Sequence, residues 1–388
     1  MSAKPTATRF ALWACLALGL PSAAAQGPTT DVLFLGNSYT AVNDLPGLFE
    51  GLALAAGRPV HVASNAPGGC TLGSPQADLE HVNNPTSLAL INQGGWDFVV
   101  LQEQSVTPAI AYTTDHFMLP AASLLDAKIH TASPLATTLF YETWGRQNPG
   151  TWCWGSWCSP AFLGFDAMQD ALTASYQTAA ASVGGEVAEV GEAWRLFFQE
   201  NPGLGLHAAD GSHPNKYGSY LATCVFYAKV FGASPVGNTF LGGLGPAQAV
   251  VLQDVAARTV FGPTCGFSDY GLGLGGANSW SLAATGSAQL GSLVGFDPAS
   301  APADAPGVWF ALSLAKNAQP LFGGTLLVDL TQLGSPLHFQ PAGGTWSLPV
   351  PSTPSLGGLE LCCQAAAPTA TQPGGWALSQ GIRLQLCP

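Results

Sequence analysis

The feature that most constrains this chain is a regular alternation of strand-like and helix-like segments from residue 31 to about residue 262. Five short apolar runs have the pattern of buried strands, at 31–36, 58–64, 96–102, 135–141 and 186–190. Stretches with helical periodicity lie between them, including 45–56, 115–131 and 165–182. Strands that alternate with helices pair in parallel through helical crossovers. The pattern therefore predicts an α/β domain with a doubly wound parallel sheet of about five strands.

A different pattern follows this region. After about residue 263 the helical periodicity disappears, and apolar runs are separated by clusters of Gly, Pro and Asn. This spacing is typical of an antiparallel β-sandwich. We therefore expect an α/β domain over 26–263, closed by a helix near 247–260, and a C-terminal β-sandwich domain over 264–388. Gly262 and Pro263 would form the hinge between them.

The first 25 residues have the pattern of a secretory signal peptide. Lys4 and Arg9 precede an apolar run over 10–20, and three alanines follow at 23–25. The run is too short to cross a bilayer as a helix, which takes about 20 residues, and no later apolar stretch is long enough. A lipoprotein anchor at Cys15 is the alternative, although this cysteine lies inside the apolar run. We therefore expect a secreted protein, extracellular or periplasmic, with no membrane span.

Charged side chains are scarce and mostly acidic. The chain has 11 Lys and Arg against 23 Asp and Glu, for a net charge of −12, and charged residues make up 9% of it, compared with roughly 25% in soluble proteins. Binding to a phosphate backbone needs a basic footprint that this composition cannot supply. A nucleic-acid partner is therefore excluded, and anionic membrane surfaces are disfavoured.

Nine cysteines are present, and eight remain when Cys15 is set aside with the signal peptide. An even number in an exported chain is compatible with up to four disulfides. Cys153 and Cys158 enclose a short Trp-rich loop and are the expected pair. Metal binding is the alternative, but paired CxxC motifs are missing. We expect no metal and no organic cofactor.

The first candidate motif is GNSYT, residues 36–40, at the end of the first predicted strand. In a flavodoxin-like sheet the active site lies at the carboxyl ends of the strands. Ser38, at a turn from strand to helix, can be exposed there as a nucleophile beside the helix N-terminus. The alternative is that Ser38 only caps the helix.

The second candidate motif is DGSHP, residues 210–214, directly before a predicted helix over 215–231. Asp210, three residues before His213, can accept a hydrogen bond from the imidazole while the other ring nitrogen faces outward. A general base needs this orientation. The alternatives are a turn aspartate beside a surface histidine, or a metal site that includes His207, but consecutive turn positions rarely converge on one ion.

The order of these residues, with serine early and aspartate and histidine late, resembles the SGNH (GDSL-type) hydrolase family over about residues 31–260. The resemblance implies that Ser38 is the nucleophile, His213 the general base and Asp210 its orienting acid. An α/β-hydrolase would instead have G-x-S-x-G in mid-chain and its acid well before the histidine.

Two further blocks carry the resemblance and imply an oxyanion hole. In APGGCT, residues 66–71, Gly69 matches the glycine whose N–H faces the oxyanion, together with the N–H of Ser38. In LQEQS, residues 101–105, Gln104 stands where the family usually has asparagine. A glutamine amide also donates N–H groups, on a stem one methylene longer. Gln102, on the same face of the strand, is the alternative donor.

Four tryptophans cluster after the fourth predicted strand, and they are Trp144, Trp152, Trp154 and Trp157. The carboxyl end of that strand faces the expected active site. One hypothesis is that this loop, closed by the expected disulfide between Cys153 and Cys158, forms a platform on which sugar rings or aromatic acyl groups stack. The alternative is a loop folded on its own aromatic cluster.

These observations predict a secreted serine esterase that hydrolyses small O-acyl esters, such as acetyl groups, by a Ser-His-Asp acyl-enzyme mechanism. The resemblance and the tryptophans favour a small-molecule or polysaccharide ester as the substrate. The alternative function is a non-catalytic, secreted carbohydrate-binding or surface-attachment protein with a degenerate SGNH domain. The C-terminal region would then be the functional part, as spacer, binder or anchor.

Overall fold

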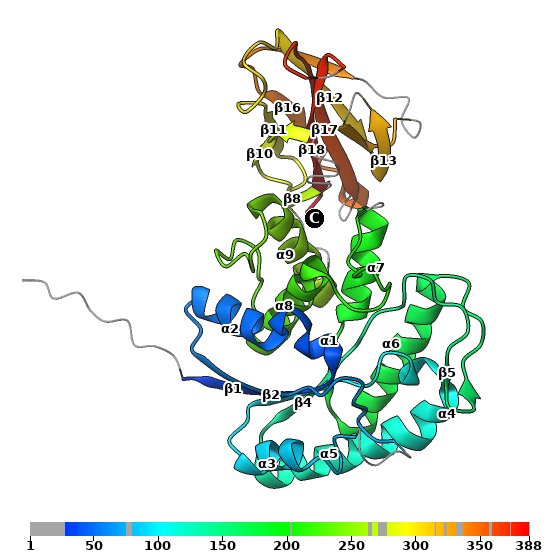
Figure 1. Ribbon diagram of the computed structural model, residues 1–388. Helices are drawn as coiled ribbons and strands as arrows, with labels where there is room; N and C mark the ends of the chain where they lie inside the picture. Colours follow the sequence, from blue (N-terminus) through cyan, green and yellow to red (C-terminus); the bar gives the residue numbers. More distant parts are fainter. Residues whose placement is uncertain are drawn as a thin grey trace, which may run out of the picture.

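The computed structural model in Figure 1 describes residues 28–74, 80–201, 204–262, 266–270, 278–314, 316–321, 324–330, 337–356, 359–372 and 374–387. The predicted signal peptide and the hinge residue Pro263 lie outside the described residues. Two bodies are visible, an α/β region and a region of β-strands beyond the helices α7 (Val190–Glu200), α8 (Lys216–Phe231) and α9 (Pro246–Phe261).

A five-stranded sheet with all neighbours parallel forms the centre of the first region. Its strand order is β2-β1-β3-β4-β7. The strands are β1 (Thr30–Leu35), β2 (Val60–Asn65), β3 (Phe98–Leu101), β4 (Thr137–Tyr141) and β7 (Glu186–Ala188). The predicted α/β class and the parallel five-stranded sheet are confirmed, with strand bounds shifted by a few residues at most.

Helices cover both faces of this sheet because its strands are apolar on both sides. Alternate residues of β1 belong to two different cores, with Phe34 in one and Leu33 in the other. The first core includes α7, α8, α9 and α2 (Leu45–Ala55). The second includes α3 (Pro85–Gln93), α5 (Leu119–Ala132) and α6 (Phe165–Val183). This arrangement leaves the carboxyl ends of the strands as the edge at which loops meet.

The C-terminal region consists of β-sheets whose neighbours are antiparallel, except that β9 pairs in parallel with β18. One sheet has the order β10-β11-β16, a second has β15-β12-β17-β18-β8 with β9 beside β18, and β13 pairs with β14. The strands are β8 (Gly266–Tyr270), β9 (Asn278–Trp280), β10 (Ala283–Gly286), β11 (Leu293–Asp297), β12 (Gly307–Ser313), β13 (Lys316–Leu321), β14 (Gly324–Val328), β15 (His338–Pro341), β16 (Trp346–Pro349), β17 (Glu360–Pro368) and β18 (Trp376–Gln385). Residues from both larger sheets share one apolar core. A β-sandwich and the domain boundary near 263 stay predictions.

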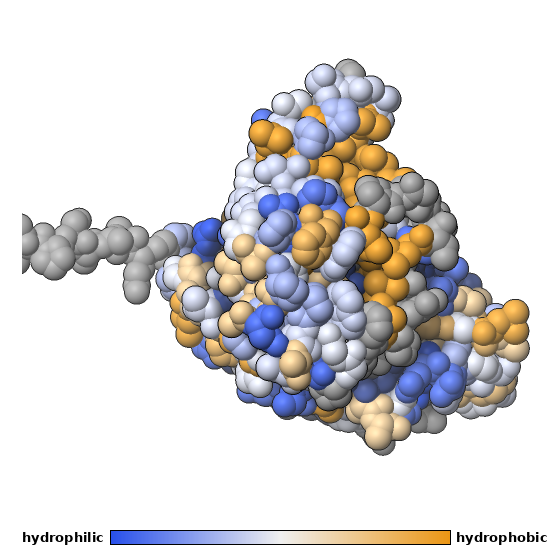
Figure 2. Space-filling model, turned by 90° about the horizontal axis from the view of Figure 1, so that it is seen from above, coloured by the Kyte–Doolittle hydropathy of each residue, from blue (hydrophilic) through white to orange (hydrophobic). Residues whose placement is uncertain are grey.

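Apolar side chains also gather on the outer surface of this region, as Figure 2 shows from above. One hollow here has a volume of about 270 Å³ and is lined almost wholly by apolar residues, among them Trp309, Leu326, Leu337 and Trp376.

A buried group of charges joins the two regions. Arg258 on α9 donates to both carboxylate oxygens of Glu200 at the end of α7, and its Nε lies 2.7 Å from Asp254. Arg383 on β18 approaches Asp254 at 3.8 Å and Glu360 at 3.6 Å. Ion pairs therefore connect helices of the first region to strands of the second.

The cysteines pair only in part as expected. The disulfide between Cys153 and Cys158 is present and closes the hairpin of β5 (Cys153–Trp154) and β6 (Trp157–Cys158). Cys70, Cys224 and Cys363 are buried thiols without a disulfide, so four disulfides do not form. Within the described part of the chain, no helix is both long and apolar enough to span a membrane.

Candidate active site

Ser38 is the first residue of a short helix, α1 (Ser38–Ala41), which follows β1 directly. Asn37 takes the capping role, because its side-chain oxygen accepts a hydrogen bond from the N–H of Tyr39 at 3.1 Å. The amide nitrogen of Asn37 donates to the Cys70 carbonyl at 2.8 Å, and its backbone N–H donates to Gln102 Oε1 at 2.9 Å. The cap is therefore Asn37, and the hydroxyl of Ser38 is left available.

The turn before α8 brings His213 to this hydroxyl, although 175 residues separate the two in sequence. His213 Nε2 lies 2.9 Å from Ser38 Oγ. On the other side of the ring, His213 Nδ1 lies 2.5 Å from Asp210 Oδ2. Asp210 Oδ1 accepts hydrogen bonds from the backbone N–H groups of Ser212 at 2.9 Å and His213 at 3.0 Å. The structure thus brings together all three residues of the predicted triad in one hydrogen-bonded chain.

The Asp210 carboxyl is held in its ionised form. The hydrogen bond with His213, followed by the two backbone N–H groups, lowers the pKa of Asp210 to about 2. Donors to a carboxylate stabilise its charged form. At neutral pH an anion therefore lies beside Nδ1, and it favours the tautomer in which Nε2 faces Ser38 without a proton.

A stack of aromatic rings supports the histidine from within the domain. Tyr39 meets His213 edge to face, with ring centroids 5.4 Å apart, and stacks on Trp144 at 4.6 Å. Trp144 stacks in turn on Trp194 at 4.0 Å. The indole N–H of Trp144 donates to the Ser212 carbonyl at 2.9 Å. The placement of Trp144 in a substrate platform was therefore wrong, because this side chain is fully buried and supports the turn that carries His213.

The other three tryptophans pack within their own loop and on nearby helices. Trp152 and Trp154 contact a small apolar cluster around Phe162 and Met168. Trp157 stacks on Tyr112 with ring centroids 5.0 Å apart. None of the three is among the residues that line the hollow at Ser38. These contacts favour the alternative, a loop folded on its own aromatic cluster.

The hollow at Ser38 has a volume of about 320 Å³. Its lining is mostly polar and consists of Asn37, Ser38, Tyr39, Gly69, Gln104, Ser105, Arg146, Asp210, Ser212 and His213. The loops after β1, β2, β3 and β4 contribute to it together with the turn before α8. All four blocks named in the sequence therefore meet here.

The two predicted oxyanion donors besides Ser38 both border this hollow. Gly69 has φ +74, and an added Cβ there would meet no atom within 4 Å, so this backbone is open to the hollow. Gln104 uses its Oε1 to accept hydrogen bonds from the N–H groups of Val106 at 2.7 Å and Thr107 at 3.3 Å. This contact orients the amide and leaves its Nε2 as the available donor.

Gln102, the alternative donor, serves the structure instead. It is fully buried, and its Oε1 accepts from both Asn37 N–H and Thr40 Oγ1 at 2.9 Å. Its Nε2 donates to the Glu103 carbonyl at 2.6 Å. Gln102 therefore braces the turn that presents Ser38.

Two buried titratable groups hold the loops of the site. Glu103 accepts hydrogen bonds from the N–H groups of Leu72 and Gln104, which ties the loop after β2 to the loop after β3. Burial raises the pKa of Glu103 to about 8. His81 Nε2 lies 2.8 Å from the Gly36 carbonyl, and burial lowers the pKa of His81 to about 4. Sequence reasoning assigned neither residue a role, since the contacts of Glu103 with Leu72 and of His81 with Gly36 are long-range.

Sequence reasoning also missed Arg146, which lies five residues beyond the end of β4. Its Nη2 donates to Ser105 Oγ at 2.8 Å, and its guanidinium lies 4.2 Å from the ring centroid of Trp152. The only available signal was an arginine just after a strand end in a chain with few basic residues.

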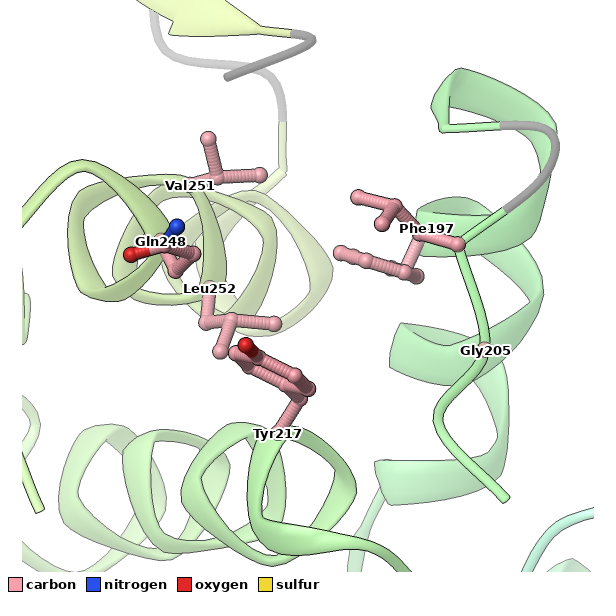
Figure 3. Close-up of a pocket in the computed structure, with 7 residues that line it drawn as sticks. Phe197, Gly205, Tyr217, Gln248, Val251 and Leu252 are labelled. Atoms are coloured by element: carbon pink, nitrogen blue, oxygen red, sulfur yellow. The ribbon is translucent and has the colours of Figure 1, made fainter. Parts of the chain in front are cut away.

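A second hollow, much smaller at about 50 Å³, lies among α7, α8 and α9 (Figure 3). Its lining includes Phe197, Tyr217, Val251 and Leu252, with no nucleophile, acid or base pair. None of the predicted site residues borders this second hollow. Among the residues that the structure describes, no group of three or more His, Cys, Asp or Glu could hold a metal ion.

No protein-family model matches this chain, and no curated protein matches it. Among solved structures, a candidate SGNH hydrolase from Slackia heliotrinireducens is 28% identical and covers 52% of this chain and 98% of its own, with a TM-score of 0.39. A DUF4886 family protein from Bacteroides uniformis is 18% identical, over 61% of this chain and 97% of its own, with a TM-score of 0.46. A carbohydrate esterase family 3 protein from Talaromyces cellulolyticus is 14% identical, over 52% and 97%, with a TM-score of 0.37. All three TM-scores are below 0.5, so the interpretation of the site rests on its own geometry.

Proposed function

We propose that this protein is a serine hydrolase of SGNH type that cleaves small O-acyl esters. The observation that carries the proposal is the continuous hydrogen-bonded chain from Asp210 through His213 to Ser38 Oγ, at the border of an open hollow. A nucleophile, a base and an orienting acid in this order define the triad arrangement.

The reaction proceeds in two steps. His213 Nε2 removes the proton of Ser38 as Oγ attacks the ester carbonyl, and the alcohol leaves with that proton. A water molecule, activated by the same nitrogen, then attacks the acyl-enzyme and releases the acid. The ionised Asp210 stabilises the imidazolium that forms in each step.

Three donors around the hollow serve the oxyanion. The N–H of Ser38 lies in the first turn of α1, where backbone N–H groups lack intrahelical acceptors. Gly69 contributes its backbone N–H from an open turn, and Gln104 contributes Nε2. Donors aimed at the developing negative charge are worth about 10²-fold to 10³-fold in turnover each.

The test is active-site labelling with a fluorophosphonate, combined with hydrolysis of 4-nitrophenyl acetate. We expect stoichiometric labelling of the wild type, and loss of both labelling and hydrolysis in Ser38→Ala and His213→Ala. Ser123→Ala, on an exposed face of α5, is the matched control and should label normally. A folded wild type that never labels would overturn the proposal and leave a binding protein as the better interpretation.

Secretion is part of the same proposal. It is supported by the signal-peptide pattern of residues 1–25 and by the disulfide between Cys153 and Cys158, because disulfides persist in oxidising compartments. Expression of the full chain followed by N-terminal sequencing should yield a mature protein that begins at Gln26. A chain retained in the cytosol with its leader would contradict this.

A further inference from the structure

Arg146 is the one cationic side chain among the ten residues that line the hollow at Ser38. No carboxylate of the described residues forms an ion pair with it. The only acid of the lining is Asp210, whose two oxygens already accept hydrogen bonds from His213 and from two backbone N–H groups. An unpaired positive charge thus faces the hollow of a protein whose net charge is −12.

The guanidinium is held in place although it has no ionic partner. The backbone N–H of Arg146 donates to Met168 Sδ at 3.4 Å. Nη2 donates to Ser105 Oγ at 2.8 Å, and the Trp152 ring packs 4.2 Å from the guanidinium carbon. The buried Nε has no hydrogen-bond partner. Most of its five N–H donors are therefore unused in a position that is fixed by packing.

We infer that Arg146 binds a carboxylate of the substrate, so that the preferred esters are anionic. A planar guanidinium matches a carboxylate through two parallel hydrogen bonds. Desolvating a charge without a partner is unfavourable, so a site that keeps an unpaired arginine favours an anion as its occupant. The inference rests on the proposed function and names its substrate class.

The size of the hollow places this carboxylate near the scissile bond. Ser38, Gln104 and Arg146 border the same space of about 320 Å³, so one small substrate must reach both the nucleophile and the cation. The carboxylate can belong to the acyl group, as in a hemiester of a dicarboxylic acid. It can also belong to the alcohol, as in an acylated hydroxy acid or uronic acid. The chemistry at Arg146 is the same for both.

The experiment compares matched esters that differ in one carboxylate. For the acyl side the pair is mono-4-nitrophenyl succinate and 4-nitrophenyl butyrate, and for the alcohol side it is 4-acetoxybenzoate and its methyl ester. The measured quantity is the ratio of kcat/KM for the anionic ester to that for the neutral ester. We expect the wild type to prefer the anion in one pair by about 10-fold to 100-fold, the size of a charge-assisted hydrogen-bonded contact.

Arg146→Gln should reduce that ratio by at least about tenfold. Arg146→Lys should retain part of the preference for the anion, since lysine keeps the charge but lacks the two parallel N–H donors of the guanidinium. The matched control is Arg58→Gln, because Arg58 also lies over an aromatic ring, that of Phe231 at 5.9 Å, but does not line the hollow. Its ratio should equal that of the wild type. Added salt should lower the wild-type preference.

Different results would overturn the carboxylate inference and the proposed hydrolase activity. If the wild type hydrolyses both members of each pair equally, or if Arg146→Gln lowers both rates by the same factor, the carboxylate inference is overturned while the hydrolase stands. Binding of mono-4-nitrophenyl succinate and of 4-acetoxybenzoate to Ser38→Ala, measured by calorimetry with and without Arg146→Gln, decides the inference even if no ester is turned over. Equal dissociation constants in the two proteins for both ligands would overturn it.

Discussion

The two regions of this molecule use their side chains in different ways. In the α/β region, loops that follow four parallel strands bring serine, glutamine and arginine to one hollow, and the turn before α8 adds histidine. In the C-terminal region the hollow of similar size is lined by tryptophan, leucine and alanine side chains. Parallel strands all end at the same edge, so polar loop residues converge there. Strands of an antiparallel sheet end at alternating edges, and a hollow on the face of such a sheet is lined by strand side chains.

Charged residues are also distributed unevenly between the two regions. Only seven charged residues lie within 264–388. Two of them, Glu360 and Arg383, join the buried group around Asp254 and Arg258. In the first region Asp210 and Arg146 thus border the hollow, and Asp254 and Arg258 form the contact between the regions, which Glu360 and Arg383 of the second region join. Variants can separate these roles.

The largest effect should come from Asp210→Asn, which changes chemistry and leaves packing intact. An amide in place of the carboxylate favours the wrong histidine tautomer, and in serine proteases with a Ser-His-Asp triad this change lowers kcat by about 10⁴-fold. Steady-state kinetics on a neutral ester should show a loss of this order with little change in Tm. Asp166→Asn, at an exposed carboxylate near Arg195, is the control and should retain full activity.

The pKa of the Asp210 carboxyl also predicts how kcat/KM depends on pH. The hydrogen bond with His213 lowers this pKa from the usual 3.8 to about 2. The charged carboxylate beside His213 is therefore fully present above about pH 4 and is lost as the pH falls through 2. The acid limb of kcat/KM above pH 4 must then belong to another group. That limb should persist in the residual activity of Asp210→Asn, and its disappearance would assign it to Asp210.

The next largest effect should come from Arg258→Met at the contact between the regions. This change leaves the carboxylates of Glu200 and Asp254 buried without their main partner, which typically costs about 3 to 5 kcal/mol of unfolding free energy. Denaturant unfolding should show this loss at pH 7. The deficit should shrink as the pH falls, because the two carboxylates can then bind protons. The exposed Arg58→Met is the control and should leave the unfolding free energy nearly unchanged. A loss below about 1 kcal/mol in Arg258→Met would show that the ion pairs of Arg258 contribute little to stability.

Gln104→Glu and Gln104→Ala should reduce kcat by about 10²-fold to 10³-fold. The glutamate keeps an acceptor for the N–H of Val106 and thereby the local loop, but it removes the donor. Equal losses in both variants would assign the effect to the missing N–H group. If only Gln104→Ala loses activity, the glutamine acts by shaping the loop, and the oxyanion hole rests on the two backbone N–H groups.

The smallest effect on turnover should come from Trp154→Ala and Trp157→Ala. Trp154 packs in the cluster around Phe162 and Met168, Trp157 stacks on Tyr112, and neither lines the hollow. KM for several esters should therefore stay unchanged while Tm decreases. A rise in KM for aromatic or sugar esters would restore the platform hypothesis for these two residues.

Local patterns predicted most of the residues that meet at the hollow. Ser38, Asp210 and His213 were identified because each belongs to a short turn whose chemistry depends on neighbouring residues. The strands were identified because burial on both faces leaves continuous apolar runs. Trp144 was misplaced because nothing nearby in sequence indicates whether a side chain after a strand turns inward. Its position depends on Trp194 and on the Ser212 carbonyl, which are far away along the chain.

The sequence by itself determined the α/β class, the parallel sheet and the three residues of the candidate triad, since periodicity and turn motifs are local properties. The tertiary structure decided that Asn37 caps the helix so that the Ser38 hydroxyl remains available, and that Gln104 and not Gln102 borders the hollow. It also decided that an unpaired Arg146 borders the same hollow as Ser38. These facts depend on which loops meet at the edge of the sheet, and that meeting is set by long-range packing.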